Sequence, residues 1–147
     1  MERAVAEGER LVALHPNSTN GYPALADALA SDGRPEEAVR VAEKGMRVDP
    51  AAHAWYAFFE ARPYVDMGRY EEAVPLLQEH TAGMPDNLWG HVSLAVAYIE
   101  LGRSQEAQAE VSAIRRISPH FSCHMLLRFE HSARWHDDGL CRKAGFN

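Results

Sequence analysis

Apolar residues recur along the chain at the three- and four-residue spacings that place side chains on one face of an α-helix. In one such segment Tyr22, Leu25, Ala26 and Leu29 form a continuous apolar stripe. The pattern predicts helices over about residues 1–14, 20–31, 35–48, 54–67, 70–82, 87–100, 104–117 and 120–129. The chain is therefore predicted to be all-α.

Glycine and proline divide the predicted helices into units of nearly constant length. A Gly-Arg pair ends the first helix of each unit, because glycine adopts a positive φ at a helix C-terminus without steric cost. The pairs begin at Gly33, Gly68 and Gly102, and the closing prolines are Pro16, Pro50, Pro85 and Pro119. These prolines stand 34, 35 and 34 residues apart. A fixed period of that size predicts a solenoid of stacked helical hairpins.

The period also predicts the domain organisation. We expect a single domain over 1–147, made of a half repeat, three full repeats and a C-terminal cap, with bounds 1–16, 17–50, 51–85, 86–119 and 120–147. The half repeat lacks a first helix, so it leaves one apolar face uncovered. We favour a chain that begins inside a longer array over a lone capping helix at the N-terminus.

Three local features refine the helix predictions. The triplet 17–19, Asn-Ser-Thr, and later Asn87 supply side-chain acceptors for the free N–H groups at helix starts. Pro63 lies inside a predicted helix, where it removes a hydrogen bond and clashes with the preceding turn. We therefore expect a kink between Phe59 and Pro63.

Composition narrows the classes of function. The 147 residues carry a net charge of -6, and their Lys and Arg residues are not clustered, so nucleic acid is not expected as a main ligand. No run approaches 18 consecutive apolar residues, so membrane insertion is not expected. Two cysteines are too few for a disulfide framework, and no secretory signal is visible at the N-terminus. These observations favour a cytoplasmic protein.

The repeat unit resembles the tetratricopeptide repeat (TPR). The resemblance covers residues 1–119 and is carried by the closing prolines and by small and aromatic residues at fixed positions: Ala26, Ala61 and Ala95, Ala38, Ala73 and Ala107, and Tyr64 and Tyr98. It implies antiparallel helix pairs that wind into a right-handed superhelix. The first helices then line a concave face that receives a peptide or another protein. Four residues depart from the family pattern: Leu29, Glu60, His80 and Ile114.

This register assigns a candidate peptide-binding face to the first helices of the repeats. Aromatic side chains offer a large contact area at low entropy cost, and they are enriched at interface hot spots. The predicted contact residues are Asp27, Trp55, Phe58, Arg62, Asp66, Trp89, Val92, Val96 and Glu100. A clamp for a C-terminal carboxylate is disfavoured, because only Asn20 and Arg62 on this face could serve it.

A second resemblance offers an alternative function. The segment 139–146, Gly-Leu-Cys-Arg-Lys-Ala-Gly-Phe, is similar to the C-terminal end of repeat blocks attached to bacterial adenylate cyclases and related regulators. It implies a regulatory or oligomerising segment of a larger signalling enzyme. Homo-oligomerisation is left open on either interpretation.

The C-terminal histidines and cysteines raise the question of a metal site. Histidines four residues apart on a helix can both reach one zinc ion. The residues concerned are His120, Cys123, His124, His131, His136 and Cys141. Neither CxxC nor HExxH spacing is present, so we favour solvated or packed histidines over a metal site. We expect neither a cofactor nor enzymatic activity, and no nucleophile elbow or phosphate loop is present.

Overall fold

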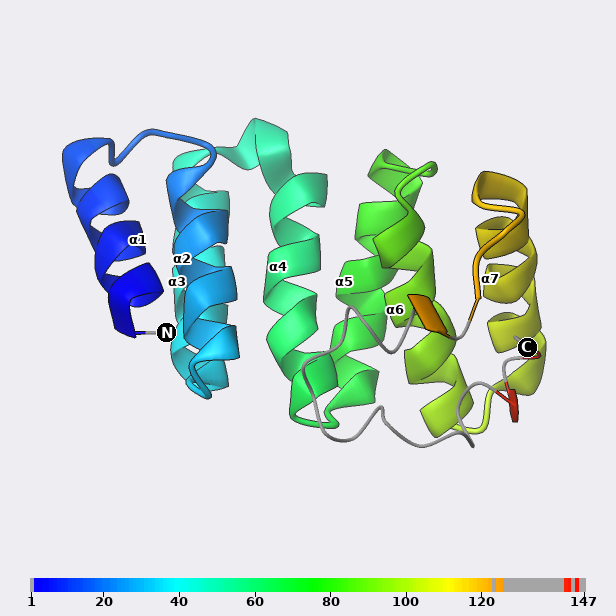
Figure 1. The fold of residues 1–147 in the computed structure, drawn as a ribbon. Helices are drawn as coiled ribbons and strands as arrows, with labels where there is room; N and C mark the ends of the chain where they lie inside the picture. Colours follow the sequence, from blue (N-terminus) through cyan, green and yellow to red (C-terminus); the bar gives the residue numbers. More distant parts are fainter. Residues whose placement is uncertain (1, 123, 126–141, 144, 146–147) are drawn as a thin grey trace. The chain divides into compact units, whose positions relative to one another are not determined.

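The computed structural model describes residues 2–122, 124–125, 142–143 and 145, and these contain seven α-helices and no strand. The helices are α1 (Glu2–Leu14), α2 (Gly21–Ser31), α3 (Pro35–Val48), α4 (His53–Asp66), α5 (Tyr70–Gly83), α6 (Leu88–Glu100) and α7 (Ser104–Ile117), with a short 3-10 helix η1 (Pro50–Ala52) before α4 (Figure 1). The all-α prediction is confirmed.

The chain divides into two compact units, Met1–Pro85 (unit 1) and Asp86–Asn147 (unit 2). The division follows Pro85, one of the prolines that close a predicted repeat. Unit 1 therefore holds the half repeat and two full repeats, and unit 2 begins with the third. That the whole chain forms a single domain stays a prediction.

In unit 1 each helix packs against the next, and α2 also contacts α4 directly (Figure 1). Close approach depends partly on Gly8, which is buried in α1 against α2. A Cβ atom added at Gly8 would lie 3.0 Å from the Cα atom of Leu25. The contact between α2 and α4 brings the first helices of two successive repeats next to one another. The candidate site lies between these two helices.

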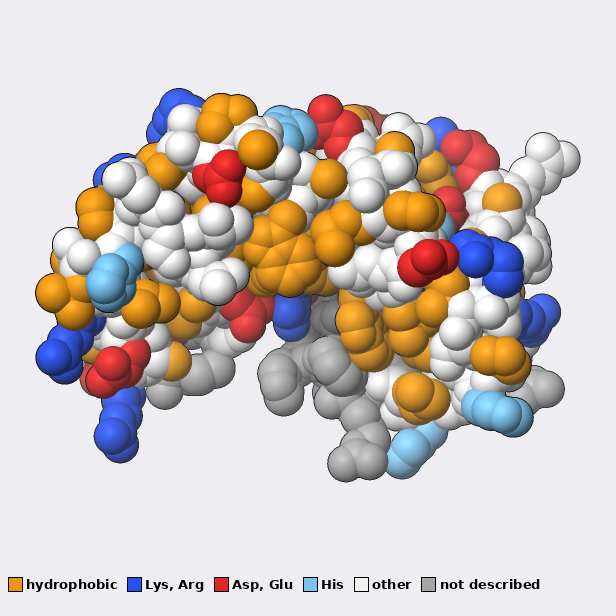
Figure 2. Space-filling model, turned by 90° about the horizontal axis from the view of Figure 1, so that it is seen from above, with side chains coloured by type: hydrophobic (Ala, Val, Ile, Leu, Met, Phe, Trp, Pro, Cys, Tyr) orange, Lys and Arg blue, Asp and Glu red, His pale blue; other side chains and the backbone are white. Residues whose placement is uncertain are grey.

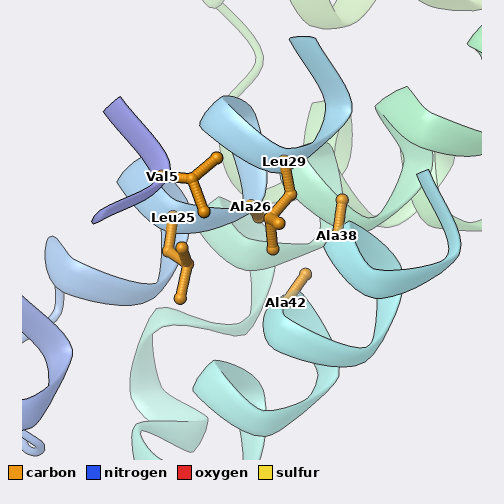
Figure 3. Packing of buried hydrophobic residues seen from close by; sticks show 6 residues of the cluster. All are labelled: Val5, Leu25, Ala26, Leu29, Ala38 and Ala42. Carbon is orange, nitrogen blue, oxygen red and sulfur yellow. The ribbon is translucent and has the colours of Figure 1, made fainter. Parts of the chain in front are cut away.

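The core of unit 1 gathers around α2. Three buried side chains of α2 pack with residues of α1 and α3 (Figure 3), and the cluster consists of Val5, Leu25, Ala26, Leu29, Ala38 and Ala42. Small residues on α3 let the α2 backbone approach, while Leu25 and Leu29 fill the space between. Full burial of a side chain such as leucine contributes about 1.5 to 3 kcal/mol to folding.

The predicted Gly-Arg turns are confirmed by the backbone. Gly33, Gly68 and Gly102 have φ values of 77°, 74° and 73°, a region that favours glycine. In the first turn the N–H of Arg34 donates to the carbonyl of Leu29 at 2.9 Å, and the corresponding bond recurs in the other two turns. This bond satisfies a carbonyl that the end of the helix leaves free.

The arginine of each turn also bonds forward into the next helix. Its guanidinium donates two hydrogen bonds to a glutamate three residues later, in the pairs Arg34–Glu37, Arg69–Glu72 and Arg103–Glu106. The second and third arginines also lie over the rings of Tyr64 and Tyr98, 4.9 and 4.8 Å from the ring centres. The Gly-Arg-x-x-Glu sequence is therefore a complete local turn.

The predictions for helix starts had mixed outcomes. Asn87 caps α6, since its side-chain oxygen accepts from the N–H groups of Trp89 and Gly90, at 3.0 and 3.4 Å. The triplet 17–19 supplies one acceptor at the start of α2, since the N–H of Asn20, the N-cap residue, donates to Ser18 Oγ at 3.4 Å. Thr19 instead donates its hydroxyl to Asp49, 30 residues away, at 2.9 Å.

Pro63 lies inside α4, which continues through it to Asp66. Its ring is buried, and the N–H of Met67 donates to its carbonyl at 3.0 Å. The expected kink between Phe59 and Pro63 stays a prediction.

Unit 2 is built on the packing of α6 against α7. His91 of α6 and Glu110 of α7 are both largely buried, and His91 Nδ1 lies 2.6 Å from Glu110 Oε2. The ring of Phe121 lies edge-on to Trp89 of α6, with ring centres 6.3 Å apart. Most of the predicted cap 120–147 lies outside the described residues.

The surface carries mixed charge. On the face that Figure 2 presents, Lys and Arg side chains lie in small groups among acidic, histidine and hydrophobic ones. The exclusion of nucleic acid as a ligand stays a prediction. Within the described ranges, none of the helices has the length and apolar character needed to cross a bilayer.

Candidate functional site

Three charged residues of the predicted binding face come together between α2 and α4. Arg62 of α4 donates to Asp27 Oδ1 of α2 at 2.7 Å, and both side chains are partly exposed. Asp66 stands one helical turn beyond Arg62. Burial raises the pKa of the Asp66 carboxyl, the Arg62 guanidinium opposes this rise, and the Asp27 carboxylate adds to it. The group is therefore two carboxylates around one guanidinium.

An aromatic cluster on α4 adjoins these charges. The rings of Trp55 and Phe59 meet edge-on with centres 5.0 Å apart, and those of Phe58 and Phe59 do so at 5.4 Å. Phe58 also contacts His80 of α5, with ring centres 5.1 Å apart. Trp55 and Phe58 are half-buried, so each presents part of its ring to solvent.

The helical period explains why these side chains share a surface. Trp55, Phe59, Arg62 and Asp66 are spaced four, three and four residues apart, which places them on one stripe of α4. That stripe faces α2, because Phe59 packs against the core cluster of unit 1 and Arg62 bonds to Asp27. The surface formed by Asp27, Trp55, Phe58, Arg62 and Asp66 is called the α2/α4 surface below.

The predicted contact residues of unit 2 differ in accessibility. Trp89 is half-buried and Glu100 is exposed, whereas Val92 and Val96 are only 4% and 3% exposed. Residues 90–98 of α6 are buried without interruption, as expected for a helix that is apolar around most of its circumference. Val92 and Val96 therefore offer little surface to a ligand here, and their role as contacts stays a prediction.

Models of the tetratricopeptide repeat family match residues 24–44 and 64–128. Both matched segments contain a turn glycine with positive φ. The chain belongs to the tetratricopeptide repeat family.

Known proteins are similar to this chain in sequence or in fold. Superkiller protein 3 of Schizosaccharomyces pombe is 32% identical over 107 residues, which are 72% of this chain and 8% of that protein. The chain thus spans less than a tenth of that relative. A thermophilic TPR protein of Thermus thermophilus has a TM-score of 0.70 and 26% identity, over 86% of this chain and 69% of its own. The first TPR of Spaghetti, solved bound to an HSP90 peptide, has a TM-score of 0.65 and 16% identity, over 70% and 83% of the two chains.

Departures from the TPR pattern mark polar residues that the sequence interpretation did not assign to a site. Glu60, at a position where the family prefers leucine, is only 9% exposed. Burial and the carboxylates of Glu43 and Glu79 raise its pKa to about 7, while His53 opposes the rise. The sequence did contain a signal for this shifted pKa, namely a carboxyl residue at a position where the family has leucine. Such a position is buried, and burial disfavours the charged form of a carboxyl group.

His80 is the second buried departure. It replaces the usual alanine of the second helix and is fully buried in α5. Its Nδ1 atom lies 2.7 Å from the carbonyl oxygen of Ala54 at the start of α4. This bond ties the two helices of the repeat together, so His80 has a structural partner within its own repeat.

The metal hypothesis for the C-terminal region cannot be assembled from the described residues. His120 and His124 are described, whereas Cys123, His131, His136 and Cys141 lie outside them. Within the parts of the chain that the structure describes, no three His, Cys, Asp or Glu side chains are grouped to hold a metal ion. Most of the segment 139–146 also lies outside the described residues, so its resemblance to cyclase-associated repeats stays a prediction.

Proposed function

We propose that this TPR chain is a protein-interaction module whose α2/α4 surface binds a peptide segment with an apolar side chain next to a lysine or arginine. The observation that carries the proposal is the meeting of half-buried Trp55 and the Asp27–Arg62–Asp66 group on one surface of unit 1. An apolar anchor beside charged groups is the usual composition of a peptide-contact surface.

The aromatic cluster supports the apolar half of this specificity. Trp55 and Phe58 are held by edge-on contacts with Phe59, so they lose little side-chain freedom when a ligand covers them. Their partly exposed rings form a rigid apolar platform at the start of α4. A leucine or aromatic side chain of a peptide would remove this platform from water.

The charges support the basic half. Two carboxylates, Asp27 and Asp66, share the single guanidinium of Arg62, so the group has an excess negative charge when both acids are ionised. The whole chain has a net charge of -6, which also favours a basic ligand. The peptide in the Spaghetti complex, SRMEEVD, has three acidic residues and one arginine, so its side chains carry a net negative charge. This chain should therefore differ from that TPR in the charge of its ligand.

The same proposal includes three broader statements. The chain acts without catalysis, in the cytoplasm, on a protein or peptide partner and not on nucleic acid.

Trp89 and Glu100 of α6 would provide a second contact region in unit 2, since both retain accessible surface.

The test begins with a displayed peptide library selected on the immobilised chain. We expect the selected peptides to combine an apolar residue with Lys or Arg, and Trp55→Ala or Phe58→Ala to weaken their binding by about tenfold. Val48→Ala serves as the matched control, because Val48 is an exposed apolar residue of α3, a helix that contributes no residue to this surface. Circular dichroism verifies that each variant keeps its helices. The proposal fails if the selected peptides are acidic, or if they bind both aromatic variants as tightly as the native chain.

A further inference from the structure

A hollow lies between α1 and α2, and no residue of the aromatic cluster lines it. It has a volume of about 560 Å³, and its walls are formed by small residues such as Gly8, Ala24 and Ala28. Leu11 and Asp27 also line it. We call it the α1/α2 groove. Its apolar walls and open shape suit a protein segment better than an ion.

Comparison of the repeats within this chain shows that the α1 side of the groove is normally covered. Leu11 stands five residues before its closing proline, as do Gly45, His80 and Ile114. Those three are buried, whereas Leu11 is 38% exposed. Ala4 stands twelve residues before the same proline and is exposed, while its counterparts Ala38, Ala73 and Ala107 are buried.

The next repeat shows what covers such a face. In the next repeat, α3 and α4 correspond to α1 and α2. The helix that covers this next pair is α2, which packs against both α3 and α4. Leu25, Ala26 and Leu29 of α2 pack with Ala38 and Ala42 of α3 (Figure 3). The α1/α2 groove is therefore shaped for a helix with the apolar spacing of α2.

The charges of the groove specify the occupant further. Its charged lining residues, Glu7 and Asp27, are both acidic. One repeat further along, α2 places Asp27 against Arg62, which occupies the same position of α4. Asp27 and Arg62 hold the same position in their repeats. A helix bound in the α1/α2 groove would therefore place its residue at that same repeat position against Asp27. A lysine or arginine there would complement both carboxylates.

We propose that the α1/α2 groove binds an amphipathic helix of a partner protein, with apolar residues at the spacing of α2 and a lysine or arginine at the position equivalent to Asp27. This site is separate from the α2/α4 surface in its apolar contacts, and the two share only Asp27. Binding would cover Leu11 and Ala4 as their counterparts in the other repeats are covered.

The test uses a fluorescent synthetic peptide of residues 17–34 that carries the change Asp27→Lys, titrated with the full chain and followed by anisotropy. We expect saturable binding that Leu11→Asp weakens by about tenfold or more, because a charge then replaces an apolar contact. The control Val48→Asp, at a site of equal 38% exposure on α3, should leave binding unchanged. Both side chains are exposed, so both variants should fold.

Two further comparisons separate the alternatives. A peptide of residues 17–34 that keeps aspartate at position 27 should bind several-fold more weakly than the peptide with lysine there. The difference in affinity between the two peptides should shrink at high salt, where charge interactions are screened. The Trp55→Ala variant of the chain should bind the peptide with lysine at position 27 as tightly as the native chain does. Failure of the α2/α4 proposal is therefore distinguishable from failure of this one. The proposal is overturned if binding does not saturate by about 1 mM peptide or is equal for Leu11→Asp. It is also overturned if light scattering shows a dimer of the chain that Leu11→Asp disperses, because a second copy would then be the occupant.

Discussion

Arg62 on α4 bonds to Asp27 on α2, 35 residues earlier in the chain, with 2.7 Å between Nη1 and Oδ1. This ion pair joins the first helices of two successive repeats and lies within the α2/α4 surface. It is partly exposed, so its effect on stability should be modest while its effect on the local charge pattern should be clear.

Replacing Arg62 by alanine should lower the free energy of unfolding by about 0.2 to 1 kcal/mol, the range for exposed ion pairs. It should also raise the pKa of Asp66 further, because Arg62 opposes the rise that burial causes. Urea denaturation of Arg62→Ala, Asp27→Ala and the double variant measures the coupling, and a carboxyl NMR titration follows Asp66. Additive single effects together with an unchanged Asp66 titration would contradict the assignment.

Glu60 should make the stability of unit 1 depend on pH near neutrality. Its pKa rises from 4.5 to about 7 in the folded chain, chiefly through burial, so between these values the folded state holds more protons than the unfolded state. Stability should therefore be greatest near the lower value and fall as the pH rises through 7. Melting temperatures between pH 5 and 8 measure this slope.

The variant Glu60→Gln should flatten that slope and be more stable than the native chain at pH 8, because an amide stays neutral. Glu71→Gln is the control, since Glu71 is an exposed carboxylate at the start of α5. If Glu60→Gln kept the native pH dependence, the buried carboxyl would not be its source.

Gly45 should tolerate no side chain. A Cβ atom at this position would lie 2.5 Å from Tyr56 Cε1 and 2.8 Å from Tyr22 Cβ, and both tyrosines are buried. Gly45→Ala should therefore destabilise the chain by about 1 to 3 kcal/mol through overpacking. Gly33→Ala gives a comparison with a different cause, because nothing lies within 4 Å and only its positive φ is strained, at a cost of about 1 kcal/mol. Urea denaturation measures the free energy of unfolding of both variants. A smaller decrease for Gly45→Ala than for Gly33→Ala would refute the close contact.

Two asparagines at equivalent helix starts should respond differently to alanine. Asn87 accepts two backbone N–H bonds at the start of α6, whereas the side chain of Asn20 makes no such bond at the start of α2. Asn87→Ala should cost about 1 kcal/mol, the usual value for a lost N-cap, and Asn20→Ala much less. Hydrogen exchange at the amides of Trp89 and Gly90 locates the effect. Equal losses for both variants would contradict the role of Asn87.

The helices could be predicted closely from sequence because their ends are encoded locally. Glycines with positive φ, prolines and the apolar period fixed the bounds of α3 and α7 without tertiary information. Within 17–19, the partner of Thr19 could not be predicted, and the reason is the opposite one. Thr19 bonds to Asp49 in the next interrepeat loop, and a contact across 30 residues is not visible in the local sequence.

The candidate site could be predicted only in part. The repeat register placed Asp27, Arg62 and Asp66 on the first helices, but their grouping depends on how α2 and α4 are aligned. Val92 and Val96 have the same register positions as partly exposed residues of α4, yet they are buried. Register specifies the direction of a side chain from its helix, whereas accessibility depends on what packs around that helix.

The Gly-Arg-x-x-Glu turns have a consequence for how the chain folds. Their bonds join residues no more than five apart, such as Arg34 to Leu29 and Arg34 to Glu37. Closing so short a loop costs little entropy, and it is faster than any pairing between distant segments. Each of the three reversals can therefore nucleate its own hairpin, and the order of assembly need not follow the order of synthesis.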